Sequence, residues 1–208
     1  MNCLNAMARV EGSNVPEHLF LANGVHVIED EYDEDYEKEV NIVTINIPIS
    51  IIGESREHCI VVGGLKMNGM GTEDNVNVSN LTLRDSKGAG VYGEEGASFH
   101  LDNVSVENSG GRGVSVWNTK RNSMKNCNVS HSKRSGLYVQ FGLMTIDGKD
   151  TTIHHNCING DSGSYGLKTY GSSSFIHLAS SLTIETISKN NGGGGNHGGY
   201  GTIKTLRR

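Results

Sequence analysis

Short alternations of apolar and polar residues recur along this chain at a constant spacing. One pattern (apolar, any residue, Asn, apolar, any residue, apolar, then a polar turn ending in Ser) occurs in residues 78–86, 101–109 and 124–132. Two markers repeat every 23 positions, an asparagine at the turn and a glycine after it: Asn80, Asn103 and Asn126, and Gly90, Gly113 and Gly136. Alternation with a period of two predicts β-strands, and a shared period predicts a repeat architecture.

Looser copies extend the repeat in both directions. A fourth copy is expected at Asn156 and Gly166, both 30 positions beyond their counterparts, with the seven extra residues in a longer loop within Phe141–Asp150. A fifth copy is expected at Ile176–Ile184. Upstream, Val43–Gly53 and Cys59–Gly63 together are expected to form an earlier coil, and Val25–Ile28 the first.

A period of 23 residues built from short strands predicts three strands per coil. The expected fold is all-β, a right-handed single-stranded parallel β-helix of about seven coils with ~23 residues in each. Residues 1–208 form one domain in this prediction. Residues 1–20 are its N-terminal cap region, and 191–201 are a Gly-rich loop before the last strand at Thr202–Leu206.

The repeat places one line of asparagines at a tight turn, where Asn tolerates a left-handed backbone. We expect their amides to bond from coil to coil as a structural ladder of Asn80, Asn103, Asn126 and Asn156. The same alignment places Cys127 and Cys157 at one inward position in adjacent coils. Reduced thiols in an apolar stack are the favoured interpretation, and a disulfide is the alternative.

The pattern resembles the right-handed parallel β-helix superfamily of pectate-lyase-like proteins. Ile47–Gly64 is similar to the early coil of many members, with a strand, a Gly-rich turn and a second strand, and the repeats extend the resemblance over roughly Leu19–Leu206. Members include polyuronate lyases, polygalacturonases, pectin esterases, C5-epimerases, tailspikes and non-catalytic surface proteins. The chain lacks the Arg-x-Pro-x-x-Arg, Gly-His-Gly, Asp-Pro-His-Glu and Asp-Phe-x-x-Gly signatures of the enzymes. The resemblance therefore specifies the fold and leaves the activity open.

Charge and composition restrict the partners. The chain has 18 Lys and Arg against 23 Asp and Glu, a formal net charge of −5, so no global field favours nucleic acid. Apolar runs such as Val43–Ile52 are too short to span a bilayer, and no membrane insertion is expected. Met1–Val10 lack the pattern of a secretory signal. The compartment stays open, and is extracellular if this chain is a mature form or fragment.

The strand that follows each repeated glycine is the candidate for function. If Val91, Val114, Leu137 and Leu167 point inward, their neighbours point outward and stack along the rod. Aromatic faces beside cations suit an acidic polysaccharide, since sugar CH faces pack on rings and carboxylates pair with Lys or Arg. The candidate carbohydrate-binding residues are Tyr92, Arg112, Trp117, Tyr138, Lys168 and Tyr170.

Two alternatives to binding alone remain open. One is β-elimination or C5 epimerisation of a uronate, which needs a cation against the carboxylate and a nearby base. The candidate catalytic residues are His131, Lys133, Arg134 and Tyr138. Lys133, Arg134, Arg112 or Lys168 would supply the cation, and His131 or Tyr138 the base. The other alternative is a non-catalytic structural or interaction module that associates end to end or laterally, because open coils expose unpaired strand edges.

No cofactor and no metal site are expected. The acidic run Glu29–Glu39 carries eight carboxylates, so weak Ca²⁺ binding is the alternative there. The run lacks the Gly and terminal Glu of an EF-hand loop, and a solvated loop is the favoured interpretation. The four cysteines include no Cys-x-x-Cys pair, which argues against a zinc site.

Overall fold

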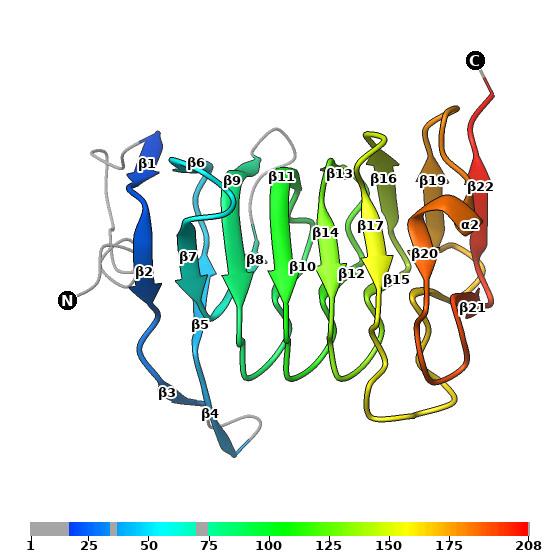
Figure 1. Cartoon of the computed structure of the whole chain (residues 1–208), viewed down its shortest axis with the longest axis horizontal. Coiled ribbons are helices and arrows are strands. Elements are labelled where there is room, and N and C mark those ends of the chain that lie inside the picture. Colours follow the sequence, from blue (N-terminus) through cyan, green and yellow to red (C-terminus); the bar gives the residue numbers. More distant parts are fainter. Residues whose placement is uncertain (1–16, 34–36, 70–74, 208) are drawn as a thin grey trace.

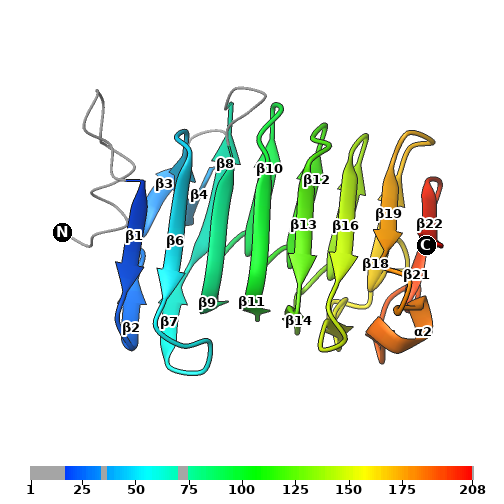
Figure 2. The same cartoon turned by 90° about the horizontal axis from the view of Figure 1, so that it is seen from above.

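The computed structural model describes residues 17–33, 37–69 and 75–207. The chain winds into a rod whose strands lie side by side in coil after coil, from β1 and β2 at one end to β21 and β22 at the other (Figures 1 and 2). Strands of successive coils pair in parallel, and only the hairpin β3–β4 pairs antiparallel among the described residues. The predicted all-β parallel β-helix is confirmed.

Two sheets make up the described rod. The first, which we call the long sheet, has a main path of β1 (His18–Leu21), β6 (Ile49–Gly53), β9 (Val76–Arg84), β11 (Phe99–Glu107), β13 (Asn122–Lys125), β16 (Leu143–Asp147), β19 (Phe175–Leu178) and β22 (Thr202–Thr205). Its branch contains β2 (Gly24–Val27), β7 (Cys59–Val62), β14 (Asn128–Ser130), β17 (Thr152–His154) and β20 (Ser188–Lys189). The branch meets the main path at β9 and β11, which run through the corner between the two rows.

The short sheet forms the other side of the rod. Its strands are β5 (Ile42–Ile45), β8 (Gly64–Asn68), β10 (Val91–Glu94), β12 (Val114–Trp117), β15 (Leu137–Gln140), β18 (Leu167–Tyr170) and β21 (His197–Gly199). The hairpin of β3 (Glu31–Asp33) and β4 (Lys38–Val40) precedes β5, and the one-turn helix α2 (Ile184–Ile187) precedes β20. Turns between the rows bring each coil back to the same position around the rod, one strand spacing further along its axis. Equivalent residues therefore stack in columns.

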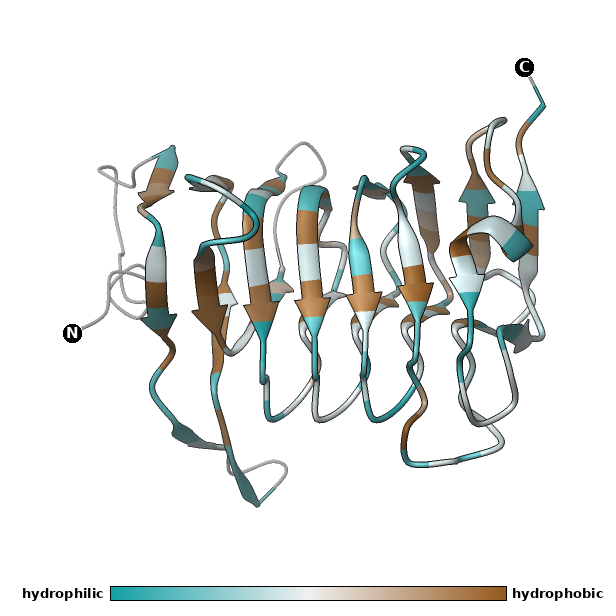
Figure 3. Cartoon of the chain, in the orientation of Figure 1, coloured by the Kyte–Doolittle hydropathy of each residue, from teal (hydrophilic) through white to brown (hydrophobic). Residues whose placement is uncertain are grey.

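The core fills the space between the sheets. Apolar side chains alternate with polar ones along each strand, visible as brown and teal bands in Figure 3, and the apolar set points inward. Val91, Val114, Leu137 and Leu167 form one such column and are fully buried. Burial of this kind in every coil supplies the hydrophobic stabilisation, at roughly 25 cal/mol per Å² of apolar surface.

The 23-residue spacing holds at the centre of the rod. Phe99 pairs with Val76, Val114 with Val91, and Leu137 with Val114, each 23 positions apart. The seven extra residues of the next coil, however, do not lie in Phe141–Asp150 as predicted. Leu143–Asp147 form β16 and pair with β13 at a shift of 22, from Asn122 to Met144. The extra residues lie instead in a long turn between β17 and β18, residues 155–166.

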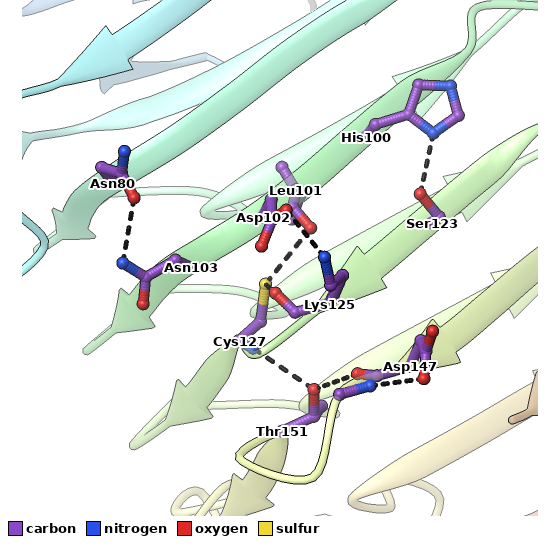
Figure 4. A network of polar contacts seen from close by, with 11 residues as sticks. Asn80, His100, Leu101, Asp102, Asn103, Ser123, Lys125, Cys127, Asp147 and Thr151 are labelled. Atoms are coloured by element: carbon purple, nitrogen blue, oxygen red, sulfur yellow. Dashed lines mark hydrogen bonds and ion pairs between the residues drawn. The ribbon is translucent and has the colours of Figure 1, made fainter.

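This change moves Asn156 out of the predicted asparagine column. Asn80, Asn103 and Asn126 adopt φ of 55°, 55° and 51°, and the Asn103 Nδ2 donates to the Asn80 Oδ1 at 3.0 Å (Figure 4). Val129 pairs with Ile153, a shift of 24 that aligns Asn156 with Ser132. The buried Asn156 accepts from the Ser132 amide at 3.0 Å and donates to the Val129 carbonyl, so it fastens a different turn.

The change of register also separates the two cysteines that were predicted to stack. Cys127 lies beside Thr151, whose Oγ1 accepts from the Cys127 amide at 3.3 Å (Figure 4). Cys157 lies in the long turn, six positions after Thr151, so the two thiols do not share one inward position. Both are buried and free, as is Cys59.

Three predicted segments at the ends of the rod also differ. His197–Gly199, inside the expected 191–201 loop, form β21 and pair with β18. The expected strand at the end of Ile176–Ile184 is replaced by the start of α2, because Thr183 caps that turn through a bond from the Thr186 amide. The N-terminal cap prediction lies largely in residues 1–16, outside the described residues, and His18–Leu21 form β1.

Candidate functional site

Two columns of side chains run along the outer face of the short sheet. In the first, Tyr92 pairs with Ser115, Ser115 with Tyr138, and Tyr138 with Lys168, as the sequence pattern predicts. Lys66 of β8 extends this column next to Tyr92. In the second, Trp117 pairs with Gln140 and Gln140 with Tyr170. Each interval between neighbours is one strand spacing of about 4.8 Å.

A hollow of about 670 Å³ lies at the N-terminal part of this face. Its floor comes from strands β5, β8, β10 and β12, one wall from the turns before β10, β12 and β15, and another wall from the β3–β4 hairpin. We call it the hairpin hollow. Its charged and aromatic lining is Glu31, Tyr32, Lys38, Lys66, Lys87, Tyr92, Arg112 and Arg134, and Ser115 lies on the floor.

The cations in the lining outnumber the carboxylates, five to one. Lys66 Nζ lies 2.6 Å from Glu94 Oε1, whose side chain is only 10% exposed, and 5.8 Å from the centre of the Tyr92 ring. Arg134 forms no ion pair with any residue that the structure describes. Lys66 is thus oriented by a nearly buried carboxylate, Lys87 is paired with Asp30 and Glu39, and Arg134 is the lining cation without an ion pair to a described residue.

The Tyr138 ring is covered by Arg112 and is shielded from solvent. The Arg112 guanidinium carbon is 3.6 Å from the centre of the Tyr138 ring, and the Tyr138 side chain is buried. Its hydroxyl donates to Gln140 Oε1 at 2.7 Å. Burial raises the pKa of Tyr138, against the opposing effect of Arg112. A neutral phenol in this position stacks against a cation and does not act as a base near neutral pH.

His131, the other predicted base, belongs to a separate cluster. Its ring stacks on His155 at 5.5 Å and meets the edge of His154 at 6.1 Å. The Nδ1 atoms of His154 and His155 lie 2.7 Å apart. Burial, followed by the charges of the other two histidines, lowers the pKa of His154. His131 does not line the hairpin hollow, and its ring contacts are with His154 and His155.

The remaining predicted residues lie around the hollow. Lys133 is exposed, and its amide donates to the Ser109 carbonyl in the turn wall. Lys168 Nζ donates to the Gly163 carbonyl and lies 5.6 Å from the centre of the Tyr138 ring. Burial lowers the pKa of Lys168, with a further contribution from Arg112. Tyr170, 45% exposed, lies on β18, beyond the hollow toward the C-terminal end, and Trp117, 42% exposed, lies on β12 two positions after the floor residue Ser115.

The sequence interpretation missed the hairpin and Lys66. A signal for Lys66 exists, because Lys66 follows Gly64 by two positions just as Tyr92 follows Gly90. The acidic run was predicted as a solvated loop, whereas β3 and β4 pair within it, Glu31 opposite Val40. Asp30 and Glu39 both contact Lys87 Nζ, at 2.6 and 3.1 Å. These long-range ion pairs carry no local sequence pattern.

Among residues 17–33, 37–69 and 75–207 no group of three or more His, Cys, Asp or Glu is arranged to hold a metal ion. Part of the acidic run proposed for Ca²⁺, residues 34–36, lies outside this range. In the same described range, no helix has the length and apolar character needed to cross a membrane.

Comparison with known proteins identifies one relationship. The model of a family described as "Right handed beta helix region" matches residues 63–204. The matched stretch begins just before β8 and reaches into β22, so it contains more than half of the chain. No curated protein and no solved structure matches the chain.

Proposed function

The chain belongs to the right-handed β-helix family, and from this premise we propose that it binds an acidic polysaccharide on the outer face of its short sheet. The observation that carries the proposal is the hairpin hollow, a concave site of about 670 Å³ whose lining holds five cations and one carboxylate. Lys66 and Lys87 are paired with carboxylates just outside this lining, whereas Arg134 forms no ion pair with a described residue, in a chain whose net charge is −5. A polyanion with a repeated carboxylate is the ligand class that such a groove fits.

The arrangement of the cations favours a ligand that lies along the rod. Lys66, Arg112 and Arg134 come from three different coils, so they are spread along the rod axis. A linear chain with one charge on each sugar meets them in succession. A compact anion such as free phosphate contacts only part of the set.

Aromatic side chains on the same face add to the site. Trp117 and Tyr170 are each more than two-fifths exposed and belong to the second outward column. Exposed rings of this kind provide faces for sugar CH groups, and they add contact area at low cost in conformational entropy. Cations and exposed rings along one face suit a sugar polymer more than a peptide or a nucleic acid.

Binding without catalysis is the function that the geometry supports best. A lyase or C5-epimerase needs a base within hydrogen-bond reach of the proton it removes. His131 lies in the separate histidine cluster, and Tyr138 is buried with its hydroxyl on Gln140. The two candidate bases therefore do not meet the cations at an accessible point of the groove.

A binding assay tests the proposal. Oligomers of galacturonate or mannuronate are titrated against the protein by calorimetry, with a neutral oligosaccharide of equal length as the reference ligand. We expect binding of the acidic oligomers only, weakening as salt rises because the charges are exposed. Arg134→Gln and Arg112→Gln should each weaken binding about tenfold, or about 1.4 kcal/mol.

Lys149→Gln is the matched control, because Lys149 is an exposed lysine outside the hollow. Its affinity should equal that of the unchanged protein. Absence of binding to every acidic oligomer, or equal loss in the control, overturns the proposal. Unsaturated products detected by ultraviolet absorbance would instead identify a lyase.

A further inference from the structure

We propose that Ser123, His100 and Asn75 form a site that hydrolyses carboxylic esters, with Ser123 as the nucleophile, His100 as its base and Asn75 as the residue that orients His100. The site lies on the outer face of the long sheet, apart from the groove of the short sheet, and it does not depend on the proposed function. The inference follows from the order of the hydrogen bonds through one histidine ring.

The coil register brings the three residues together from adjacent coils. His100 on β11 pairs with Ser123 on β13, 23 positions later. Asn75 directly precedes β9, the strand that pairs with β11 on its other side. Phe99 and Leu101, on either side of His100, are buried in the core. His100, Ser123 and Asn75 are each partly exposed, so they lie where a dissolved substrate reaches them.

The two bonds of the His100 ring fix the position of its proton. His100 Nε2 lies 3.3 Å from Asn75 Oδ1, and an amide oxygen only accepts, so Nε2 carries the proton. Nδ1 then keeps its lone pair, and it accepts from the Ser123 hydroxyl at 2.8 Å (Figure 4). A serine whose proton is directed at a histidine base, which is in turn oriented by a third group, has the arrangement of an activated nucleophile.

The charge around His100 favours the basic form of its ring. Burial lowers the pKa of His100, followed by the positive charge of Arg121. The ring is therefore neutral near pH 7 and is ready to take a proton from Ser123. A cation in this neighbourhood also favours the negative oxygen that develops when a nucleophile adds to an ester carbonyl.

A second serine–histidine pair shows what the order of the bonds decides. Ser55 Oγ lies 3.2 Å from His58 Nδ1, but the Ser55 hydroxyl donates to Asn23 Oδ1 at 2.9 Å. A hydroxyl has one proton, so His58 Nδ1 has to donate to Ser55 and does not act as a base toward it. The Ser123 hydroxyl, in contrast, donates to its histidine. Ser55 is therefore the matched control for Ser123.

The reaction is an acyl transfer in two steps. Ser123 Oγ attacks the carbonyl carbon of the ester while its proton passes to His100 Nδ1. The bond from the carbonyl carbon to the alcohol oxygen breaks, the alcohol leaves with the proton from His100, and the acyl group remains on Ser123. Water, with His100 again as the base, then releases the carboxylic acid and restores the serine hydroxyl.

Hydrolysis of p-nitrophenyl acetate and labelling by a fluorophosphonate test the assignment. We expect a burst of nitrophenol stoichiometric with the protein, followed by slower turnover, and we expect the probe on Ser123 in mass spectrometry of peptides. Ser123→Ala and His100→Gln should each lower kcat/KM about 100-fold, and Ser55→Ala should leave it unchanged. Labelling uses the unaltered protein, so it decides the question even where a variant does not fold.

Three outcomes overturn the proposal. The first is a probe found elsewhere and not on Ser123. The second is the absence of both labelling and turnover. The third is an equal loss of turnover in Ser55→Ala and Ser123→Ala, because the direction of the hydrogen bond would then make no difference.

Asn75 is a positioning residue, and the pH profile tests this role. Asn75→Asp keeps an acceptor for Nε2 and adds a negative charge, which raises the pKa of His100. Activity should be retained, with the acid limb of the kcat/KM profile moved to higher pH. Asn75→Leu removes the acceptor and should lower kcat/KM at least about tenfold, because the ring is no longer held in one tautomer. An unmoved profile in Asn75→Asp overturns the role of Asn75.

Discussion

At the scale of single residues, the turns depend on side chains that accept a left-handed backbone. Asn80, Asn103 and Asn126 form one column of positive φ, and Asp85, Asn108 and His131 form a second. Left-handed conformations cost other L-residues roughly 1–2 kcal/mol, whereas Asn and Asp bond locally and tolerate them. The Asn108 Nδ2 donates to Asp85 Oδ1 at 3.2 Å, so the second column is also linked between coils.

Substitution of Asn103 separates backbone conformation from side-chain bonding. Asn103→Gly removes the bond to Asn80 and keeps a residue suited to φ of 55°. Asn103→Val removes the bond and adds a β-branched side chain in the same conformation. We expect the free energy of unfolding of Asn103→Val, measured with denaturant, to be about 1–2 kcal/mol lower than that of Asn103→Gly. Equal stability of the two variants would contradict a left-handed turn at this position.

The phenol of Tyr138 gives a pH-dependent prediction. Its pKa is raised above the ordinary value of about 10 by burial, so folding favours the neutral form. The stabilisation is complete below the ordinary pKa and is lost as pH rises through the raised pKa of the folded protein. Titration followed by tyrosinate absorbance should show a late-ionising phenol that Tyr138→Phe removes. In the denatured proteins, the titration of the parent should differ from that of Tyr138→Phe by one phenol that ionises near the ordinary pKa.

At the scale of elements, the sequence predicted the coils that have no insertions and failed where register depends on distant contacts. Strands β9 to β12 keep the 23-residue shift, so periodicity alone aligned them. Asn-Cys recurs at 126–127 and 156–157, which favoured a false alignment, while the true register follows the buried Val129 and Ile153. The repeated Asn-Cys dipeptide was therefore a poorer guide to the register than the buried apolar positions.

The candidate site, too, was predictable from the sequence only in part. The outward columns through Tyr92, Tyr138 and Tyr170 follow from strand alternation and were predictable. The covering of Tyr138 by Arg112, and the hairpin wall held by Lys87, depend on contacts between different coils. An acidic run is interpreted as a solvated segment unless the cation that pairs with it is known. Because Lys87 is distant in the sequence, no local pattern identified that wall.

The hairpin provides a prediction about local opening. Lys87→Met removes the hydrogen bonds that raise the pKa of Lys87, first that of Asp30 and then that of Glu39. Hydrogen exchange of the β3–β4 amides should become faster, while exchange in β11 stays unchanged. Lys149→Met, which removes an exposed lysine elsewhere, should leave hairpin exchange as it was. Unchanged exchange in Lys87→Met would mean that the hydrogen bonds of Asn41 with the Lys87 amide and the Asp85 carbonyl alone hold the hairpin.

At the scale of the whole molecule, each coil contacts chiefly its two neighbours, so stability is close to a sum over coils and their interfaces. Ends of such a rod open more easily than its centre. Buried thiols are distributed along the rod and report on this directly. Cys59 lies in β7, Cys127 at the central coils, and Cys157 at the start of the long turn.

Thiol labelling gives the corresponding prediction. Burial raises the pKa of Cys127 and of Cys157 to about 11, so both should resist alkylation in the native protein. In a Cys3→Ser background, rising denaturant should expose Cys59 or Cys157 before Cys127. Mass spectrometry after a short pulse of reagent identifies which thiol has reacted. Exposure of all three at one denaturant concentration would show that the rod unfolds as a single unit.

The long turn at residues 155–166 lengthens one coil without disturbing the columns on either side. Leu137 still pairs with Leu167 across a shift of 30, while Val129 pairs with Ile153 across 24. Asn156 anchors the start of the turn, and Ile158–Gly163 extend into solvent. This position is therefore a natural graft site: foreign peptides inserted after Ile158 would be displayed at a fixed height on the rod, which makes the protein a candidate scaffold for spacing epitopes.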